Sequence, residues 1–200
     1  MAEHPPPETT PESVFDDAFK PYAAEIGFLL RDWNNLQDSL SALFVSLFPI
    51  DQSGAISAAW HAVPNDRFQR AMLRASLKVT FDMPSDRRKL MQEQREHKFF
   101  KDEISWILER ADTLGRQRDD AAHVPVAMVI SESLKFIAHI YSGNPISQKL
   151  RGKELLTEFK LYRNRAIVLR NYADRINLYM HRRKRGPLPE RPQWPSSPQS

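Results

Sequence analysis

Three long stretches of this sequence repeat their apolar residues every three or four positions, which is the period of an amphipathic α-helix. They cover Tyr22 to Phe48, Asp86 to Leu114 and Lys153 to about Arg182. Each stretch is too long for a strand, and each presents an apolar face that must be buried against another element. The pattern therefore predicts a mainly α fold, organised as an antiparallel helical bundle.

Shorter helices are expected before and between the first two long ones. Thr10 is a suitable N-cap for a short helix over Pro11–Lys20, and Pro21 is expected to break or bend it. A loop then leads to one or two helical turns over Ala55–His61. Asn65 or Asp66 caps a further helix that runs to about Phe81.

The region after the second long helix changes character. Gly115 is expected to stop that helix, and Arg116–His123 is expected to form a separate short helical segment that Pro125 ends. Residues 126–141 then favour a small β-hairpin inserted among the helices, with one more helix as the alternative.

Composition divides the chain into three parts. Residues 1–20 form a mostly disordered head with the possible short helix, residues 21–181 form the helical bundle domain, and residues 182–200 form a basic, proline-rich disordered tail without core-forming residues. The net charge of +4 permits contact with nucleic acid but does not argue for it.

Several classes of function are excluded by what the sequence lacks. With no cysteine there is no disulfide framework and no thiolate metal site. No glycine-rich phosphate loop, no zinc-binding His-Glu-x-x-His and no Gly-x-Ser-x-Gly elbow occurs. We therefore expect no metal and no cofactor. Neither a secretory signal nor an apolar run of membrane-spanning length is present, so we expect a cytoplasmic protein with no membrane partner.

One polar cluster remains as the candidate site, around Arg116, Arg118, Asp119 and His123. Asp119 lies four residues before His123, so on a helix its carboxylate would fix the tautomer of the imidazole and favour its protonated form. An arginine beside a histidine supplies a fork for phosphate oxygens and a group that moves a proton. This is the minimum set of groups for cleaving RNA without metal: His123 acts as base or acid while Arg118 stabilises charge on phosphorus.

Helix geometry limits this hypothesis. Five residues of an ideal helix turn by about 500°, which leaves Arg118 and His123 on well-separated faces. Three ways to bring them together remain open: the long arginine reaches back, the segment unwinds before Pro125, or a second copy of the chain completes the site.

Arg118-Asp-Asp-Ala-Ala-His123 resembles the Arg-x4-6-His signature of HEPN domains. These are all-helical intracellular domains, many of them ribonucleases, that commonly dimerise so that two motifs meet at a shared cleft. The family favours a polar residue directly after the arginine, and Asp119 supplies it. The resemblance implies a homodimer that acts on RNA, with Arg118 and His123 as the active pair and Asp119 as their orienting partner. Many such ribonucleases act in defence or toxin systems beside a neutralising partner protein.

Other positions are weaker candidates. Arg116 also satisfies the spacing but is followed by Gln117, so it is assigned to substrate binding together with Arg70 and Asn34. Asn34 belongs to a polar row with Gln37 and Ser41 along the first long helix, either a half-exposed boundary or a patch that faces a site on another helix. Arg175 and His181 fit the spacing too, but they lie late on an amphipathic helix and have Ile176 in the polar position.

Three hypotheses follow from these residues. The first is a metal-independent endoribonuclease that cleaves by attack of the 2′-hydroxyl, with the Arg/His pair at a dimer cleft. The second is a non-catalytic helical domain that binds RNA, a nucleotide or a protein partner through the same cleft. The third is a helical scaffold in which the cluster is only a salt-bridged turn.

Overall fold

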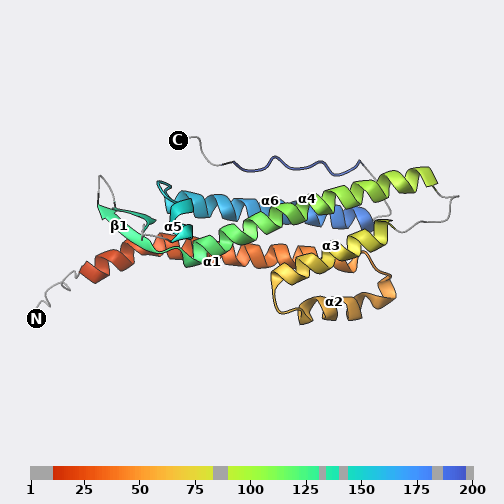
Figure 1. The fold of residues 1–200 in the computed structure, drawn as a ribbon, viewed down its shortest axis with the longest axis horizontal. Helices are drawn as coiled ribbons and strands as arrows, with labels where there is room; N and C mark the ends of the chain where they lie inside the picture. Colours follow the sequence, from red (N-terminus) through yellow and green to blue (C-terminus); the bar gives the residue numbers. More distant parts are fainter. Residues whose placement is uncertain (1–10, 83–89, 131–133, 140–143, 182–186, 197–200) are drawn as a thin grey trace, which may run out of the picture.

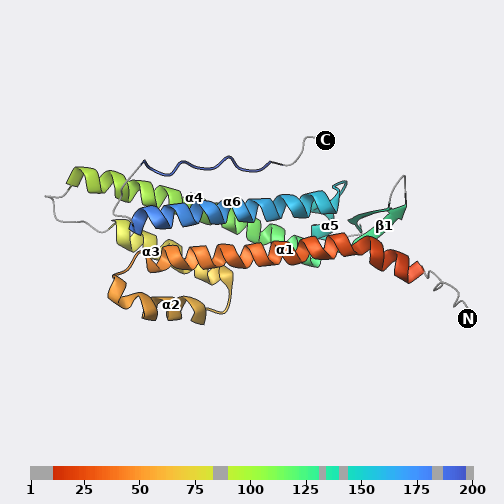
Figure 2. The ribbon, with the colours of Figure 1, turned by 180° about the vertical axis from the view of Figure 1, so that it is seen from behind.

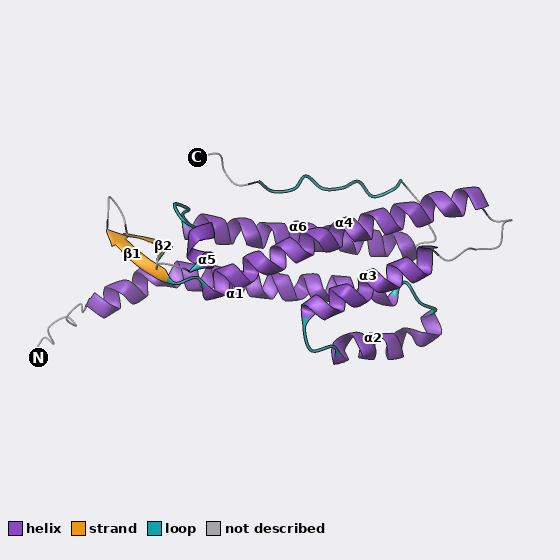
Figure 3. Cartoon of the chain, in the orientation of Figure 1, coloured by secondary structure: helices purple, strands orange, loops and turns teal. Residues whose placement is uncertain are grey.

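The computed structural model describes residues 11–82, 90–130, 134–139, 144–181 and 187–196. Within these ranges helices dominate and the two strands form one antiparallel hairpin, as Figures 1 and 3 show, which confirms the mainly α fold with a small β-hairpin. In chain order the elements are α1 (Pro11–Val45), the short 3-10 helix η1 (Ile50–Gln52), α2 (Ser53–Ala62), α3 (Asp66–Asp82), α4 (Leu90–His123), β1 (Val126–Ile130), β2 (Leu134–Ala138), α5 (Pro145–Lys149) and α6 (Leu155–His181).

The long helices α1, α4 and α6 lie side by side, with α3 and α2 on one flank (Figures 1 and 2). α1 and α6 run in the same direction, because the Tyr22 hydroxyl donates to Glu154 near the start of α6 and the Ser39 hydroxyl donates to Asp174 further along. α4 runs antiparallel to both. The alternation expected of an antiparallel bundle therefore applies to α4 and not to the α1–α6 pair.

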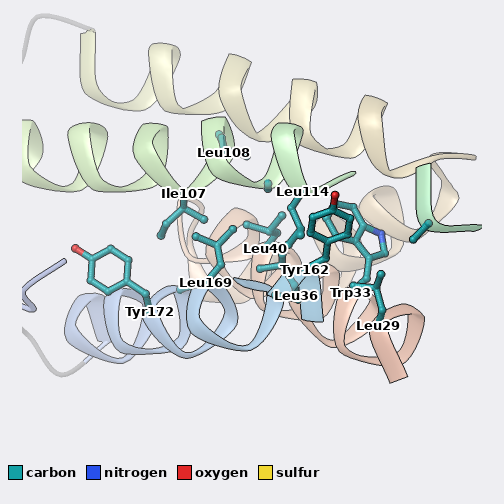
Figure 4. Packing of buried hydrophobic residues seen from close by; sticks show 14 of the residues in the cluster. Leu29, Trp33, Leu36, Leu40, Ile107, Leu108, Leu114, Tyr162, Leu169 and Tyr172 are labelled. Carbon is teal, nitrogen blue, oxygen red and sulfur yellow. The ribbon is translucent and has the colours of Figure 1, made fainter. Parts of the chain in front are cut away.

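The core lies between these three helices, where their apolar faces meet (Figure 4). No helix in the described ranges combines the length and hydropathy that crossing a membrane requires. Most of the periodic positions of the long helices are buried, and they include Leu29, Trp33, Leu36, Leu40, Ile107, Leu108, Leu114, Tyr162, Leu169 and Tyr172.

Of the break or bend expected at Pro21, the break is wrong, since α1 continues from Pro11 to Val45. A proline inside a helix removes one backbone hydrogen bond and costs about 3 kcal/mol. Around this point Phe15, Phe19 and Tyr22 surround the ring of Phe136 from β2, with centroid separations of 5.1, 5.2 and 4.9 Å. Burial of these aromatic rings offsets the cost of the proline.

The predicted stop at Gly115 is also wrong, because α4 runs unbroken to His123 and includes the segment expected to be separate. Gly115 serves close packing instead of termination. A Cβ at this position would lie 3.2 Å from the Trp33 ring and 3.3 Å from Arg70 Nη2. Both contacts are tight, so a side chain at this position would press on Trp33 and Arg70, and glycine lets them pack closely against α4.

The hairpin that was predicted for residues 126–141 is present, and the alternative of one more helix is wrong. Val126 pairs with Ala138 and Ile130 with Leu134 in antiparallel register. Phe136 and Ala138 of β2 are buried, and the backbone N–H of Phe136 donates to the Tyr22 hydroxyl. The hairpin therefore closes the end of the bundle at which α1 begins and α4 ends.

The expectation of a tail without core-forming residues is wrong for residues 187–196, which lie along α4 and α6. Trp194 packs edge-on against Trp106, with 6.0 Å between the ring centroids, and the backbone carbonyl of Pro195 accepts a hydrogen bond from Arg165. Arg191 donates to Glu103 at 2.7 Å. The basic run 182–185 and the head 1–10 lie outside the described residues.

Candidate functional site

Arg118 lies in the last two turns of α4, facing the N-terminal end of α3. Its Nη2 donates to Asp66 Oδ2 at 2.7 Å, and its guanidinium lies over the Trp33 ring, 5.1 Å from the centroid. Asn65 is the N-cap of α3, accepting from the backbone N–H of Phe68, so Asp66 is held in the first turn. The predicted active arginine is thus fixed by α1 and α3 together.

The Asp66 carboxylate is the centre of this arrangement. Its Oδ2 also accepts from the Trp33 indole at 3.0 Å, and its Oδ1 lies 3.6 Å from Arg70 Nη1. The Arg70 guanidinium lies 5.3 Å from the centroid of the Trp33 ring. The indole therefore makes cation–π contacts with Arg70 and Arg118, and one carboxylate holds all three groups in place.

Arg70, predicted to bind substrate, is paired with neighbouring carboxylates. Only 5% of its side chain is exposed, and its Nε donates to Asp112 at 2.8 Å, where Arg74 donates as well. Burial disfavours the charged form of Asp112, but hydrogen bonds from Arg70 and Arg74 outweigh burial, so the pKa of this carboxyl lies below its usual value. Asp112 therefore stays ionised and orders α3 against α4.

Two open hollows flank Arg118 and Asp66, which line both of them. The first hollow, of about 440 Å³, lies between α1, α2 and the start of α3, and Asn34 lines it. The second hollow, of about 470 Å³, lies between α3 and α4, and the exposed Arg116 lines it. The predicted residues Arg118, Asn34, Arg70 and Arg116 are therefore brought to one region of the molecule.

His123 is not brought to that region. It is the last residue of α4, its side chain is exposed, it lines neither hollow, and no hydrogen bond or ion pair joins it to the part of the chain that the structure describes. Asp119, expected to orient His123, instead pairs with Arg118 Nε at 3.1 Å. Because α4 stays helical through Arg118 and His123, one protomer does not bring the two motif residues together, and local unwinding before Pro125 does not occur.

Six further polar side chains of the first hollow were not assigned to the site from sequence: Gln37, Asp38, His61, Asn65, Asp66 and Gln69. Gln37 belongs to the polar row that the sequence predicts with Asn34 and Ser41, and Asp38 is its neighbour on the same helix. In the structure Asn34 and Gln37 line the first hollow, whereas Ser41 is buried and does not line it. His61 follows the buried Trp60 at the end of α2. From sequence, Trp60 and His61 with Asp66, Arg67 and Arg70 are either a second cluster that lines the site or a core anchor followed by a helix start, and in the structure Trp60, His61 and Asp66 line the first hollow.

Within the described residues, no group of three histidine, aspartate or glutamate side chains is placed to hold a metal ion. Comparison of the chain with protein-family models, with curated proteins and with solved structures found no match.

Proposed function

We propose that the chain is a metal-independent endoribonuclease of HEPN type, cytoplasmic and active as a homodimer. The observation that carries the proposal is the position of Arg118, which lies between two open polar hollows, while His123 is exposed and without a partner among the described residues. A second copy can supply the His123 that the first protomer does not bring to its own Arg118.

In the proposed reaction, the 2′-hydroxyl of one nucleotide attacks the adjacent phosphorus while a His123 imidazole takes its proton. The bond from phosphorus to the 5′-oxygen breaks, and this oxygen takes up a proton as it leaves. The products are a 2′,3′-cyclic phosphate and a 5′-hydroxyl. Arg118 pairs with Asp66 through Nη2 and with Asp119 through Nε, so Nη1 remains for a phosphate oxygen.

A second candidate is a domain that binds RNA or a protein partner without cutting. One observation favours it: two carboxylates, those of Asp66 and Asp119, already neutralise Arg118. A neutralising or partner protein is compatible with either candidate.

The test is incubation of purified protein with cellular RNA in a chelator, followed by analysis of the product ends. We expect cleavage that leaves cyclic phosphates, reduced at least about 100-fold by His123→Ala because a positioned proton-transfer group contributes that much or more. His181→Ala is the matched control, since His181 is also exposed, ends α6 and completes the other Arg-to-His spacing. Binding of RNA without cleavage by the wild type would favour the second candidate.

Complementation tests the dimer. If Arg118 of one protomer works with His123 of the other, a mixture of the Arg118→Gln and His123→Ala proteins forms mixed dimers in which one of the two sites is complete. Cleavage then recovers on mixing. If the two inactive proteins are shown to form mixed dimers and these dimers still do not cut RNA, a site shared between protomers is contradicted.

A further inference from the structure

The first hollow contains polar side chains that the fold leaves without partners. Asn34, Gln37 and Asp38 of α1 and His61 of α2 have no hydrogen bond or ion pair within the part of the chain that the structure describes. The spacing of the three α1 residues places them on one face of that helix. The free groups of this hollow are thus two carboxamides, a carboxylate and an imidazole.

Gln37 is the most informative of the four. Both its Nε2 and its Oε1 are buried, and neither has a hydrogen-bond partner. An unpaired buried carboxamide is costly, and native proteins usually satisfy such a group with a neighbour, a water or a ligand. Gln37 is half-buried and lines the hollow, so a turn of its side chain brings the carboxamide within reach of a ligand there. A ligand that pairs with both atoms must present a donor and an acceptor side by side.

The two hollows differ in charge, so the first favours a neutral ligand group and the second an anionic one. Asp38 and Asp66 oppose Arg118 in the first hollow, so this hollow does not favour an anion. In the second hollow five arginines oppose three aspartates, which favours a phosphate. Arg118 stands at the junction of the two, which matches a nucleotide whose base enters one hollow while its phosphate enters the other. The arginines are Arg67, Arg70, Arg74, Arg116 and Arg118, and the aspartates are Asp66, Asp112 and Asp119.

We propose that the first hollow is a base-reading subsite, in which the Gln37 carboxamide pairs with the edge of one RNA base that carries an exocyclic amino group, adenine above all. A carboxamide pairs with adenine through two hydrogen bonds, accepting from the amino group and donating to a ring nitrogen. The Asp38 carboxylate only accepts, so it favours an edge with a second donor hydrogen. The adenine amino group offers two such hydrogens, whereas uracil offers only N3–H on this edge, and the Gln37 carbonyl already takes it. The assignment of RNA as the ligand rests on the proposed function.

The test measures binding, separately from cleavage. The full chain carrying His123→Ala, in a chelator, is titrated into labelled oligoadenylate and oligouridylate, and binding is followed by fluorescence anisotropy. We expect about tenfold tighter binding of oligoadenylate, the size of one base contact of this kind. Gln37→Leu in this background should remove the preference, because it keeps the size of the side chain and deletes both polar atoms.

Gln117→Leu is the matched control, since Gln117 also has a buried, unpaired carboxamide oxygen but lines neither hollow. It should leave the preference intact. Asp38→Asn is a second variant at an exposed position, so it does not threaten the fold, and it should weaken the preference. Equal binding of the two oligonucleotides, or a preference that Gln37→Leu and Asp38→Asn leave unchanged, would overturn the subsite.

The outcomes separate this inference from the proposed activity. If the wild-type protein binds oligoadenylate selectively through Gln37 but cuts no RNA, the result supports the base-reading subsite and contradicts the endoribonuclease activity. If the protein cuts RNA through His123 and the sites of cleavage do not change in Gln37→Leu, the result supports the endoribonuclease activity and contradicts the subsite.

Discussion

Asp66 joins three parts of the molecule through one carboxylate. It begins α3, and it contacts Trp33 of α1, Arg118 of α4 and Arg70 one turn along its own helix. The arginine that we propose for catalysis is therefore also part of the structure. Its ion pair with Asp66 sets the direction of the guanidinium before any ligand arrives.

A substitution at Asp66 should therefore weaken the fold. Asp66→Ala leaves a half-buried Arg118 and the indole N–H without their acceptor, and we expect a loss of about 2 kcal/mol in the free energy of unfolding. Urea denaturation followed by circular dichroism measures it. Asp38→Ala, on the same hollow but exposed and unpaired, should change the free energy by no more than about 0.5 kcal/mol. Equal effects at the two positions would show that Asp66 does not hold the cluster.

At the level of the helix, α4 continues through Gly115, a residue type that usually ends helices, and packs closely against its neighbours at that point. Gly115 was expected to separate the polar segment from the long helix, and the structure uses its missing side chain to seat Trp33 and Arg70. The indole cannot easily move away, because it is almost fully buried, hydrogen-bonded to Asp66 and in contact with two guanidinium groups.

Glycine-to-alanine substitutions should therefore have opposite signs in α4 and α1. In an open helix interior the change stabilises by about 1 kcal/mol. Gly27 of α1 has no atom within 4 Å of an added Cβ, so Gly27→Ala should raise the free energy of unfolding, whereas Gly115→Ala should lower it because the Cβ meets the Trp33 ring at 3.2 Å. Thermal and urea melts compare the two variants. Stabilisation by Gly115→Ala would mean that the packing of Trp33 against α4 is loose.

At the scale of the whole molecule, periodicity was a good guide to the long helices and a poor guide to their ends and to long-range contacts. The apolar faces around Leu36, Leu108 and Leu169 are buried as expected, since one face of each long helix must be covered. The break at Pro21 and the stop at Gly115 failed because local preference yields to packing against Phe136 and Trp33, which lie far away in sequence.

The residues that line the two hollows were predicted only in part, for the same reason. Arg118 could be picked out by a local motif, and Asn34 by its place in a polar row. The hollow that they share with His61 depends on how α2 packs against α1, and no local sequence pattern predicts that packing. The contact of Asp119 with Arg118 instead of His123 follows from the unbroken α4, which was itself missed.

The contacts of the C-terminal segment 187–196 bear on where the folded domain ends. Trp194 lies against Trp106, and the guanidinium groups of Arg110 and Arg165 lie 5.2 and 5.7 Å from the centroid of its ring. The neighbouring Arg191 neutralises Glu103, a buried carboxylate that otherwise accepts only from the Tyr172 hydroxyl among the described residues. The segment therefore anchors the outer face of α4 and α6.

Trp194→Ala should lower the free energy of unfolding by about 2 kcal/mol, less than a fully buried tryptophan because the side chain is only partly covered. Gln193→Ala is the control. The Gln193 side chain lies next to Trp194 in sequence but is exposed and has no partner within the described ranges, so its loss should leave the free energy of unfolding unchanged. Denaturant melts of both variants measure the difference. If Trp194→Ala melts like the wild type, the segment is an appendage that contributes nothing to the bundle. The expected loss would instead make residues 187–196 part of the folded domain, whose boundary then lies beyond the end of α6 at His181.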